Sequence, residues 1–295
     1  MSTLYQDQSA NIRKTWLLMG VFLIVVIGIG WGISWYYNSS VILYVAVAFA
    51  LVMNVGSYWF SDKIVLSMTH ARPATREEFF DFYTVAENLA ITAGLPLPKL
   101  FIINDPAPNA FATGRNEKHA VVCATTGLLA MLTRTELEGV IAHEMSHIKN
   151  RDMLVMTVAV VLAGFIAIIA DMFIRMSFFG GGNRDNDSKA GVIMLVLGIV
   201  AAILAPIAAQ LIKLAVSRKR EFLADASGAL LTRYPEGLAS ALQKISSYGA
   251  PMRNANTATA HLFIANPFGA GAMKGVTKLF MTHPPVEERI KALLD

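Results

Sequence analysis

Cysteine is nearly absent from this sequence, since Cys123 is the only one among 295 residues. A lone cysteine excludes an internal disulfide, and nothing in the sequence marks an oxidising compartment. Charge is also scarce, because 16% of the residues are charged, against about 25% in an average soluble domain. Together with 55% hydrophobic residues, this composition favours a membrane protein.

A strong excess of one charge is absent as well. The formal net charge is +4 and the basic residues are scattered, so the sequence predicts no nucleic-acid partner. Lys and Arg instead flank long apolar runs, where they are typical of membrane topology signals. The partner that this composition predicts is a lipid bilayer.

Four long apolar runs dominate the sequence. They cover residues 15–37, 41–60, 153–174 and 190–212. Each has about the 20 residues that a helix needs to cross roughly 30 Å of hydrocarbon. Polar turns join the first run to the second and the third to the fourth, so we predict two transmembrane hairpins.

The first run resembles a signal peptide at its start, because Arg13 and Lys14 precede it. However, no small-residue cleavage pattern follows it. It ends instead in aromatic residues of the kind that anchor spans at the membrane interface, namely Trp31, Trp35, Tyr36 and Tyr37. We therefore predict a retained membrane anchor.

The distribution of Lys and Arg predicts the orientation of the spans. The turn at 38–40 has neither, and the 175–189 turn has three, which are Arg175, Arg184 and Lys189. Most other basic residues near the spans lie on the opposite side. The positive-inside rule therefore predicts that both termini and both polar segments, 61–152 and 213–295, are cytoplasmic.

The polar segments contain helix and strand patterns. Capping boxes of Thr75 with Glu78 and of Thr135 with Glu138 predict the starts of two helices, the first over 75–93. Between them, apolar stretches predict three strands and a short helix, at 99–104, 109–114, 119–125 and 126–132. The second segment reads as helices over 213–232, 236–247 and 286–294.

The second capped helix carries the motif HEMSH at residues 143–147. Residues four apart lie on one face of a helix, so His143 and His147 can both bind one Zn²⁺ at about 2.0–2.1 Å. Glu144 lies one step round the helix, which is the place of a general base acting on water. The pattern predicts one catalytic zinc per chain rather than a surface helix with two incidental histidines.

The third protein ligand must come from elsewhere. One group of zinc hydrolases has a glycine and then a third histidine after this motif, but Asn150 and Met153 stand at those positions here. The stretch "SRKREFLADASG" (217–228) offers Glu221 and Asp225 one turn apart. We predict that Glu221 binds the metal and Asp225 holds the second nitrogen of a ligand histidine. The alternative for this stretch is a plain basic helix beside the membrane.

The predicted topology also locates the site. The second hairpin leaves the cytoplasm just after His147 and returns just before Glu221. Both ligand helices therefore extend from the cytoplasmic ends of neighbouring spans. We expect the site at the cytoplasmic membrane surface, where water is available.

Four stretches carry a close resemblance: "LTRTELEGVIAHEMSHIKNRD", "SRKREFLADASG", "NAFATG" and "THPPVEERI". Together they are similar to the HtpX-type membrane zinc metalloproteases, which are relatives of the CaaX-prenyl endopeptidase family. The resemblance implies a mainly α fold with a small β-sheet, in which four transmembrane helices in two hairpins join a cytoplasmic zincin-like (gluzincin) protease domain. By matching motifs it implies His143, His147 and Glu221 as zinc ligands and Glu144 as catalytic base.

The resemblance further implies a multi-pass endopeptidase of the bacterial inner membrane, with its active site facing the cytoplasm. Its substrates would be damaged or misassembled membrane proteins, degraded under stress. The chain then divides into two hairpins, 1–60 and 153–212, and two catalytic parts. The part 61–152 holds the HEMSH helix, and the part 213–295 holds the third ligand.

Two further sites are candidates. The stretch "NAFATG" predicts a strand that can pair with an extended substrate through its backbone, at Asn109, Ala110, Phe111, Ala112 and Thr113. An ordinary internal strand is the alternative. His283, just before a predicted helix, is a candidate hydrogen-bond donor to the oxyanion, with a packing role equally open.

Two other functions stay open at this point. One is a prenyl-protein-type endopeptidase with a narrow substrate, which assays with and without a lipidated peptide would separate. The other is a non-enzymatic membrane protein with a structural zinc. Structural sites usually close all four positions with protein ligands, often thiolates, and one cysteine and an unused Glu144 argue against this.

Overall fold

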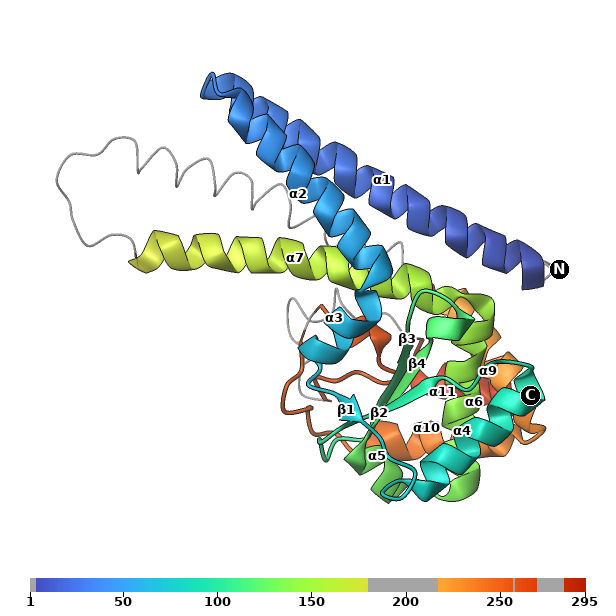
Figure 1. The fold of residues 1–295 in the computed structure, drawn as a ribbon. Helices are drawn as coiled ribbons and strands as arrows, with labels where there is room; N and C mark the ends of the chain where they lie inside the picture. Colours follow the sequence, from blue (N-terminus) through green and yellow to red (C-terminus); the bar gives the residue numbers. More distant parts are fainter. Residues whose placement is uncertain (1–3, 180–216, 257, 270–283) are drawn as a thin grey trace.

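The structure, a computed structural model, describes residues 4–179, 217–256, 258–269 and 284–295. Within these ranges the chain is mostly helical and has one small mixed sheet (Figure 1). Two long N-terminal helices project from a body that contains the sheet, and a third long helix runs out of that body. A mainly α fold with a small β-sheet, as the sequence predicts, is confirmed.

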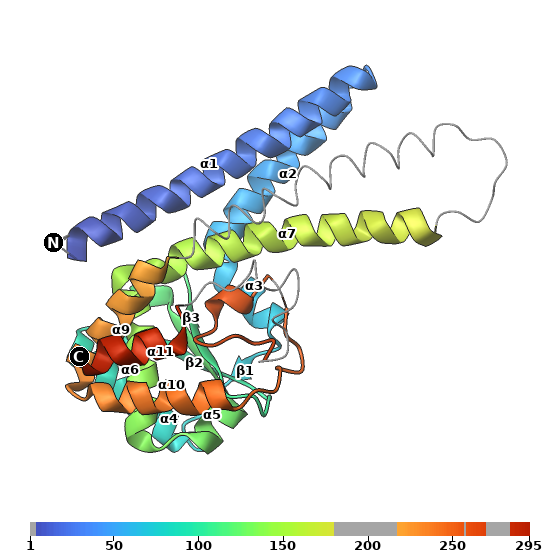
Figure 2. The ribbon, with the colours of Figure 1, turned by 180° about the vertical axis from the view of Figure 1, so that it is seen from behind.

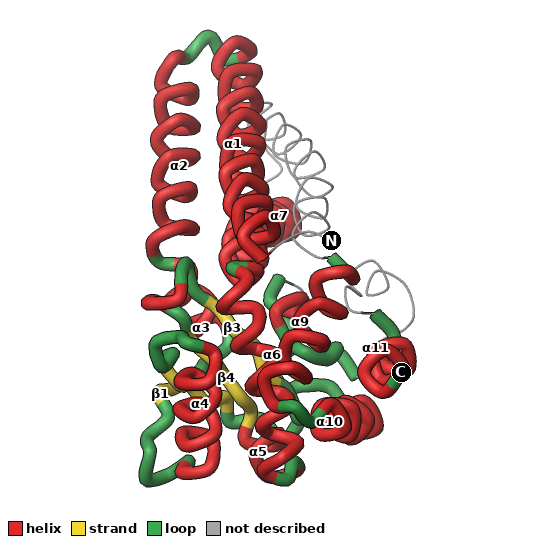
Figure 3. Tube along the Cα trace, turned by 90° about the vertical axis from the view of Figure 1, so that its right-hand side faces the viewer, coloured by secondary structure: helices red, strands yellow, loops and turns green. Residues whose placement is uncertain are grey.

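The first two apolar runs form a helical hairpin, α1 (Leu4–Tyr36) and α2 (Ser40–Trp59), which Figure 3 shows side by side. Their apolar stretches have mean hydropathies of 2.4 and 2.0 and are long enough to cross a membrane. Large apolar side chains on the hairpin are exposed, Ile24 at 70%. Such a surface is suited to contact with lipid rather than with water.

The third apolar run forms α7 (Asp152–Phe179). Its first half is buried from two sides. Val158 and Leu162 pack with Phe22 of α1, while Val160 packs with Phe111 of the sheet. The helix therefore joins the hairpin to the body. The predicted fourth run, 190–212, lies outside the described residues.

The three predicted strands form β2 (Lys99–Ile103), β3 (Ala110–Thr113) and β4 (Val121–Thr125). A two-residue strand that the sequence did not indicate, β1 (Arg72–Pro73), extends the sheet. The order is β1-β2-β4-β3, with β2 and β4 parallel and the other pairs antiparallel. Among the described residues, β3 thus has a strand partner on one side only.

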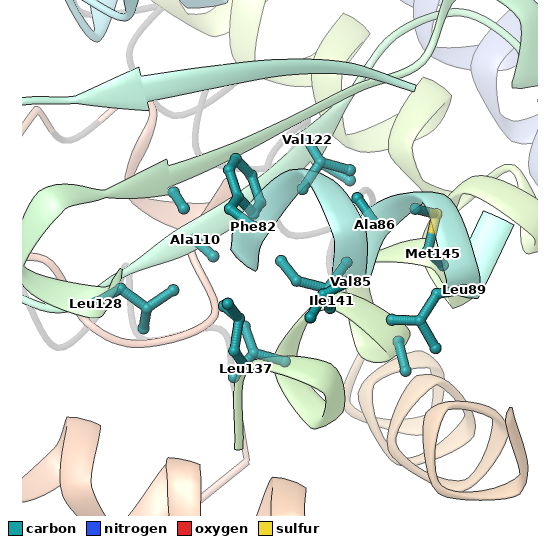
Figure 4. Packing of buried hydrophobic residues seen from close by; sticks show 14 of the residues in the cluster. Phe82, Val85, Ala86, Leu89, Ala110, Val122, Leu128, Leu137, Ile141 and Met145 are labelled. Carbon is teal, nitrogen blue, oxygen red and sulfur yellow. The ribbon is translucent and has the colours of Figure 1, made fainter. Parts of the chain in front are cut away.

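Side chains of the strands alternate between the two faces of the sheet, as pleating requires. Val122 lies in the cluster formed with α4 (Phe80–Ala93) and α6 (Arg134–Asn150), whereas its neighbour Cys123 lies in the cluster with α7. Figure 4 shows Phe82, Ile141 and other members of the first cluster. Full burial of each such large side chain stabilises the fold by about 1.5–3 kcal/mol.

The remaining helices complete the body. Figure 2 shows α9, α10 and α11 together on one side of the molecule. The elements are α3 (Ser61–Met68), η1 (Glu117–His119), α5 (Thr126–Met131), α9 (Arg218–Thr232), α10 (Pro235–Ser247), η2 (Ala260–Leu262) and α11 (Val286–Leu294).

Of the first predicted capping box only half forms, since Thr75 Oγ1 accepts a hydrogen bond from the Glu78 N–H at 3.3 Å, and the second box is displaced. The Glu78 carboxylate pairs with Arg72 instead of closing a box, and α4 begins at Phe80. At α6 the box is formed two residues earlier than expected, by Thr133 and Glu136. Thr133 and Glu136 fit the same sequence pattern as Thr135 and Glu138, so the pattern alone does not choose between the two boxes.

Candidate metal centre

Close helix crossings bring the ligand helices together. At Gly228 of α9, an added Cβ would lie 3.0 Å from the backbone nitrogen of His143 in α6. At Gly139 of α6, an added Cβ would lie 2.6 Å from the backbone nitrogen of Leu238 in α10. Because glycine has no Cβ, α9 and α10 can both pack directly on the backbone of α6.

The N-terminal end of α6 is fixed by polar contacts with α10. The Glu136 carboxylate accepts hydrogen bonds from Ser240 at 2.6 Å and from Lys244 at 2.8 Å, besides its cap on Thr133. Burial alone would raise the pKa of Glu136, but these contacts outweigh it and lower the pKa to about 2. The helix that carries the histidines is therefore anchored through a charged group.

Three potential metal ligands converge where α6 meets α9. The Nε2 atoms of His143 and His147 lie 3.1 Å apart. The Glu221 carboxylate faces both rings, with Oε2 at 3.8 Å from His143 Nε2 and Oε1 at 3.7 Å from His147 Nε2. All three side chains are buried, and their ligand atoms lie within 4.8 Å of one another. The geometry brings together the three residues that the sequence analysis selected.

The donor set fits a divalent zinc-like ion. Ligand atoms at about 2.0–2.1 Å from a tetrahedral ion lie roughly 3.3–3.4 Å from one another, close to the separations found here. Two imidazoles and one carboxylate are also the ligands typical of a catalytic site, which keeps its fourth position open.

The carboxylate of Asp225 lies beside the outer nitrogen of His143. Its Oδ1 lies 2.9 Å from His143 Nδ1, one turn beyond Glu221 on α9. Arg289 of α11, which is 1% exposed, donates two hydrogen bonds to Asp225 at 2.7 and 2.8 Å and one to the Ile264 carbonyl at 3.2 Å. Burial lowers the pKa of His143, and Asp225 offsets only part of this effect.

A second carboxylate, Asp152, holds the outer nitrogen of His147, and sequence reasoning missed it. Its Oδ2 lies 3.3 Å from His147 Nδ1. Burial lowers the pKa of His147, but the contact with Asp152 and the nearby Glu221 outweigh it and raise the pKa to about 9. The available signal was a carboxylate five residues after His147, at the last position of the polar segment 61–152, but no role was assigned to it.

Glu144 lies between the two histidines on α6 and is 2% exposed. Burial raises its pKa to about 7, and a hydrogen bond from the Ala112 backbone N–H on β3 works in the opposite direction. The carboxylate can therefore exchange protons near neutral pH. The Cys123 thiol has its pKa raised by complete burial, which makes it a poor nucleophile.

The edge strand β3 borders this site, but a segment of the chain already occupies part of its free edge. The Ala110 carbonyl accepts a hydrogen bond from Ile264 N–H at 2.9 Å. The Asn109 side chain lies outside the strand and bonds to the Ala265 backbone. Residues 264–265 thus run antiparallel to 110–109.

Phe263 continues this pairing, because its ring contacts Phe111 edge-on with centroids 5.1 Å apart. Ala112 and Thr113 complete the strand beyond that contact. The candidate oxyanion donor His283 lies outside the described residues, which begin again at residue 284.

Comparison with known sequences identifies relatives over nearly the whole chain. The sequence pattern described as "Peptidase family M48" matches residues 78–295. A "Protease HtpX homolog" of Caldanaerobacter subterraneus subsp. tengcongensis is 48% identical, with 99% of this chain and 97% of that protein aligned. Proteins of the same name from Pyrococcus furiosus and Streptococcus gordonii are 48% and 43% identical, over 94% and 98% of this chain and 94% and 99% of theirs.

A solved structure shares the fold. The crystal structure of S. mikatae Ste24p superposes with a TM-score of 0.50 at 20% sequence identity, over 99% of this chain. The matched region spans 66% of the length of that protein. At this identity the likeness concerns the fold alone.

Proposed function

The chain belongs to peptidase family M48, as a membrane metalloprotease of the HtpX type, and from this we propose that it binds one Zn²⁺ through His143, His147 and Glu221. The observation that carries this proposal is the grouping of their ligand atoms within 4.8 Å, buried beside Glu144. When bound, the metal supplies a Lewis acid that polarises the scissile carbonyl and makes water more acidic.

Glu144 acts as the general base. A group with a pKa of about 7 is well matched to proton transfer at neutral pH, because it can both accept and return a proton. In this proposal its carboxylate takes a proton from the attacking water and later delivers it to the leaving amine. The N–H of Ala112 orients the carboxylate without ligating the metal.

Asp225 and Asp152 fix the tautomers of the two histidines. Asp152 accepts a hydrogen bond from His147 Nδ1, and Asp225 Oδ1 lies 2.9 Å from His143 Nδ1, so in this proposal each Nε2 lone pair is left for the metal. Arg289 in turn holds Asp225 with two parallel hydrogen bonds. The ligand geometry is therefore imposed before the metal arrives.

Substrates bind as an extended strand along the free edge of β3. Backbone pairing of this kind reads main-chain groups rather than side chains, which suits a protease with varied substrates. Because Ile264 already pairs with Ala110, the substrate begins at Ala112 and Thr113, or else displaces residues 263–265. We further propose that the substrates are damaged or misassembled membrane proteins, as in stress-related quality control.

The proposed setting is a bacterial inner membrane crossed four times, with the site at the cytoplasmic surface. Two observations support it: α1 and α2 are long and apolar, and α7 begins five residues after His147. A reporter fused after Asp295 is expected in the cytoplasm, and one inserted near residue 186 on the far side. Cytoplasmic signal from the second fusion would contradict the four-span arrangement.

The narrower alternative, a prenyl-protein-type endopeptidase, has weaker support. Its structural support is the Ste24p fold, of which this chain spans 66% at 20% identity, whereas the HtpX homologues match it almost end to end. A non-enzymatic protein with a structural zinc is set aside, because the family is proteolytic.

Metal analysis of purified full-length variants tests the proposed site. Glu221→Ala removes one of three ligands and is expected to reduce zinc content strongly. Asp225→Ala keeps all three and should weaken zinc binding about 10–100-fold. Glu236→Ala, an exposed carboxylate on α10, is the control and should bind zinc like the wild type. Full zinc content in Glu221→Ala would contradict the ligand assignment.

A further inference from the structure

Asn11 is a buried polar residue near the start of the first membrane helix. It is 3% exposed, and its neighbour Thr15 donates a hydrogen bond to its backbone carbonyl at 3.0 Å. An amide buried in this way must find partners for its own donors and acceptor. In α1 those partners come from the metal-site helices.

The amide of Asn11 uses both its donors and its acceptor. Its Nδ2 donates to the Asn150 carbonyl at 3.1 Å and to Asp152 Oδ1 at 2.6 Å. Its Oδ1 accepts a hydrogen bond from Arg220 Nη1 at 3.1 Å. The side chain therefore contacts the end of α6, the start of α7 and the start of α9 at once.

Two of these partners are directly linked to a proposed metal ligand, one by contact and one by sequence. Asp152 uses Oδ1 for Asn11 and turns Oδ2 to His147 Nδ1 at 3.3 Å. Arg220 precedes Glu221 in the sequence, and its Nε lies 3.9 Å from Asp152 Oδ1. Together with the direct contact between Arg220 and Asp152, Asn11 thus joins the His147 side of the centre to the Glu221 side.

We propose that Asn11 is a positioning residue for the metal centre, which makes metal affinity depend on the docking of the first membrane helix. It orients Asp152 against His147 and holds Arg220, and with it the start of α9, in register. The inference rests on the metal ligands proposed above. It adds that the membrane hairpin completes the site as well as anchoring the enzyme.

Gln8 provides a matched comparison. It lies almost one turn before Asn11 on α1, and its Nε2 donates to the Lys149 carbonyl at 2.6 Å. Like Asn11 it therefore binds the C-terminal end of α6, but its bond to Lys149 does not reach Asp152. Loss of Gln8 removes one docking contact and leaves the Asp152–His147 pair intact.

Zinc affinity of the full-length protein in detergent tests the proposal, measured by titrating apo-protein against a chromophoric chelator. Asn11→Ala is expected to weaken zinc binding about 10–100-fold, as loss of support behind a ligand does. Gln8→Ala should stay near the wild-type affinity. Wild-type affinity in Asn11→Ala, or equal weakening in Gln8→Ala, would overturn the proposal.

A double-mutant cycle separates positioning from general destabilisation. If Asn11 acts in part through Asp152, the Asn11→Ala/Asp152→Asn double variant should lose less zinc affinity than the two single losses combined, because only the Arg220 contact is left to lose. Fully additive losses would contradict this route. Thermal unfolding of the apo-proteins is the parallel readout, in which Asn11→Ala and Gln8→Ala should both be folded.

If Asn11→Ala does not fold, the isosteric Asn11→Asp carries the test. It keeps an acceptor for Arg220 but removes the donor to Asp152, so weak zinc binding is expected and wild-type binding would overturn the proposal. Glu221→Ala separates a failure of the proposed metal ligands from a failure of the proposed role of Asn11. Full zinc content in that variant contradicts the metal centre itself, whereas its loss beside a normal Asn11→Ala contradicts only the role of Asn11.

Discussion

The hairpin α1–α2 and the helix α6 differ in which side chains they expose and which they bury. On the hairpin, large apolar side chains point outward, Ile24 and Tyr44 among them at 70% and 68% exposure. In α6 the reverse holds, because the ionisable residues Glu136, His143 and Glu144 are all buried. A buried charge is tolerated only with a partner, so α6 depends on specific pairings with distant segments.

The two regions are nevertheless not independent. One side of α7 packs on the hairpin through Val158, and another packs on the sheet through Val160. Asn11 adds a polar junction to this apolar contact. A long apolar segment is therefore enough to form the hairpin, whereas the catalytic region needs a specific polar contact for each buried ionisable group. Variants of each kind of contact can test this difference.

The largest effect is expected at Arg289. Arg289→Ala leaves the buried Asp225 carboxylate without its two charge-assisted hydrogen bonds, which should lower the free energy of unfolding by about 3–5 kcal/mol. Chemical denaturation in detergent measures this. Lys291→Ala, an exposed residue on the same helix, is the control. Equal free energies of unfolding for the two variants would show that the buried Arg289–Asp225 pair does not stabilise the fold.

A matched pair of isoleucines compares the two regions directly. Ile141 is fully buried in the core cluster, and Ile141→Ala should cost about 2–5 kcal/mol of unfolding free energy through lost burial and a cavity. Ile24→Ala, on the exposed face of the hairpin, should change it little. Similar losses from the two substitutions would mean that the outer face of the hairpin is packed against protein.

The smallest effect concerns pH. The pKa of Glu136 is lowered from 4.5 to about 2, so its carboxylate stabilises the fold above about pH 4.5, and this contribution is lost as the pH falls toward 2. We expect about 1–2 kcal/mol, since its partner Lys244 is 41% exposed. Glu136→Gln should flatten the fall in stability between pH 4.5 and 2. Glu138→Gln, a half-buried carboxylate on α6 that pairs with the exposed Arg134, is the control; the same flattening there would reject this assignment.

Patterns among residues close together in the sequence predicted the strands and the helix that carries the histidines. Strands β2, β3 and β4 follow from apolar stretches, and the spacing of His143 and His147 places them on one helix face. Glu221 was identified from its residue type and from the resemblance. The structure brings it beside both histidines.

Contacts between distant segments could not be predicted. Asn11 and Asp152 are separated by 141 positions, and Arg289 and Asp225 by 64, and neither pair leaves a local pattern. The pairing of Ile264 with Ala110 involves backbone atoms, so residue types carry no signal for it. The start of α4 was wrong because of a local contact instead, in which Arg72 takes the carboxylate of Glu78 six residues later.

The most direct test is the proteolytic activity of Glu144→Gln, measured together with its zinc content. Glutamine has the size of glutamate and can hydrogen-bond to Ala112, but it cannot take a proton from water. Proteolysis should fall by about 10²–10⁴-fold while zinc stays at one per chain, because the three ligands are unchanged. Near-normal cleavage with zinc bound would place the base elsewhere, and loss of zinc would show that Glu144 supports the metal itself.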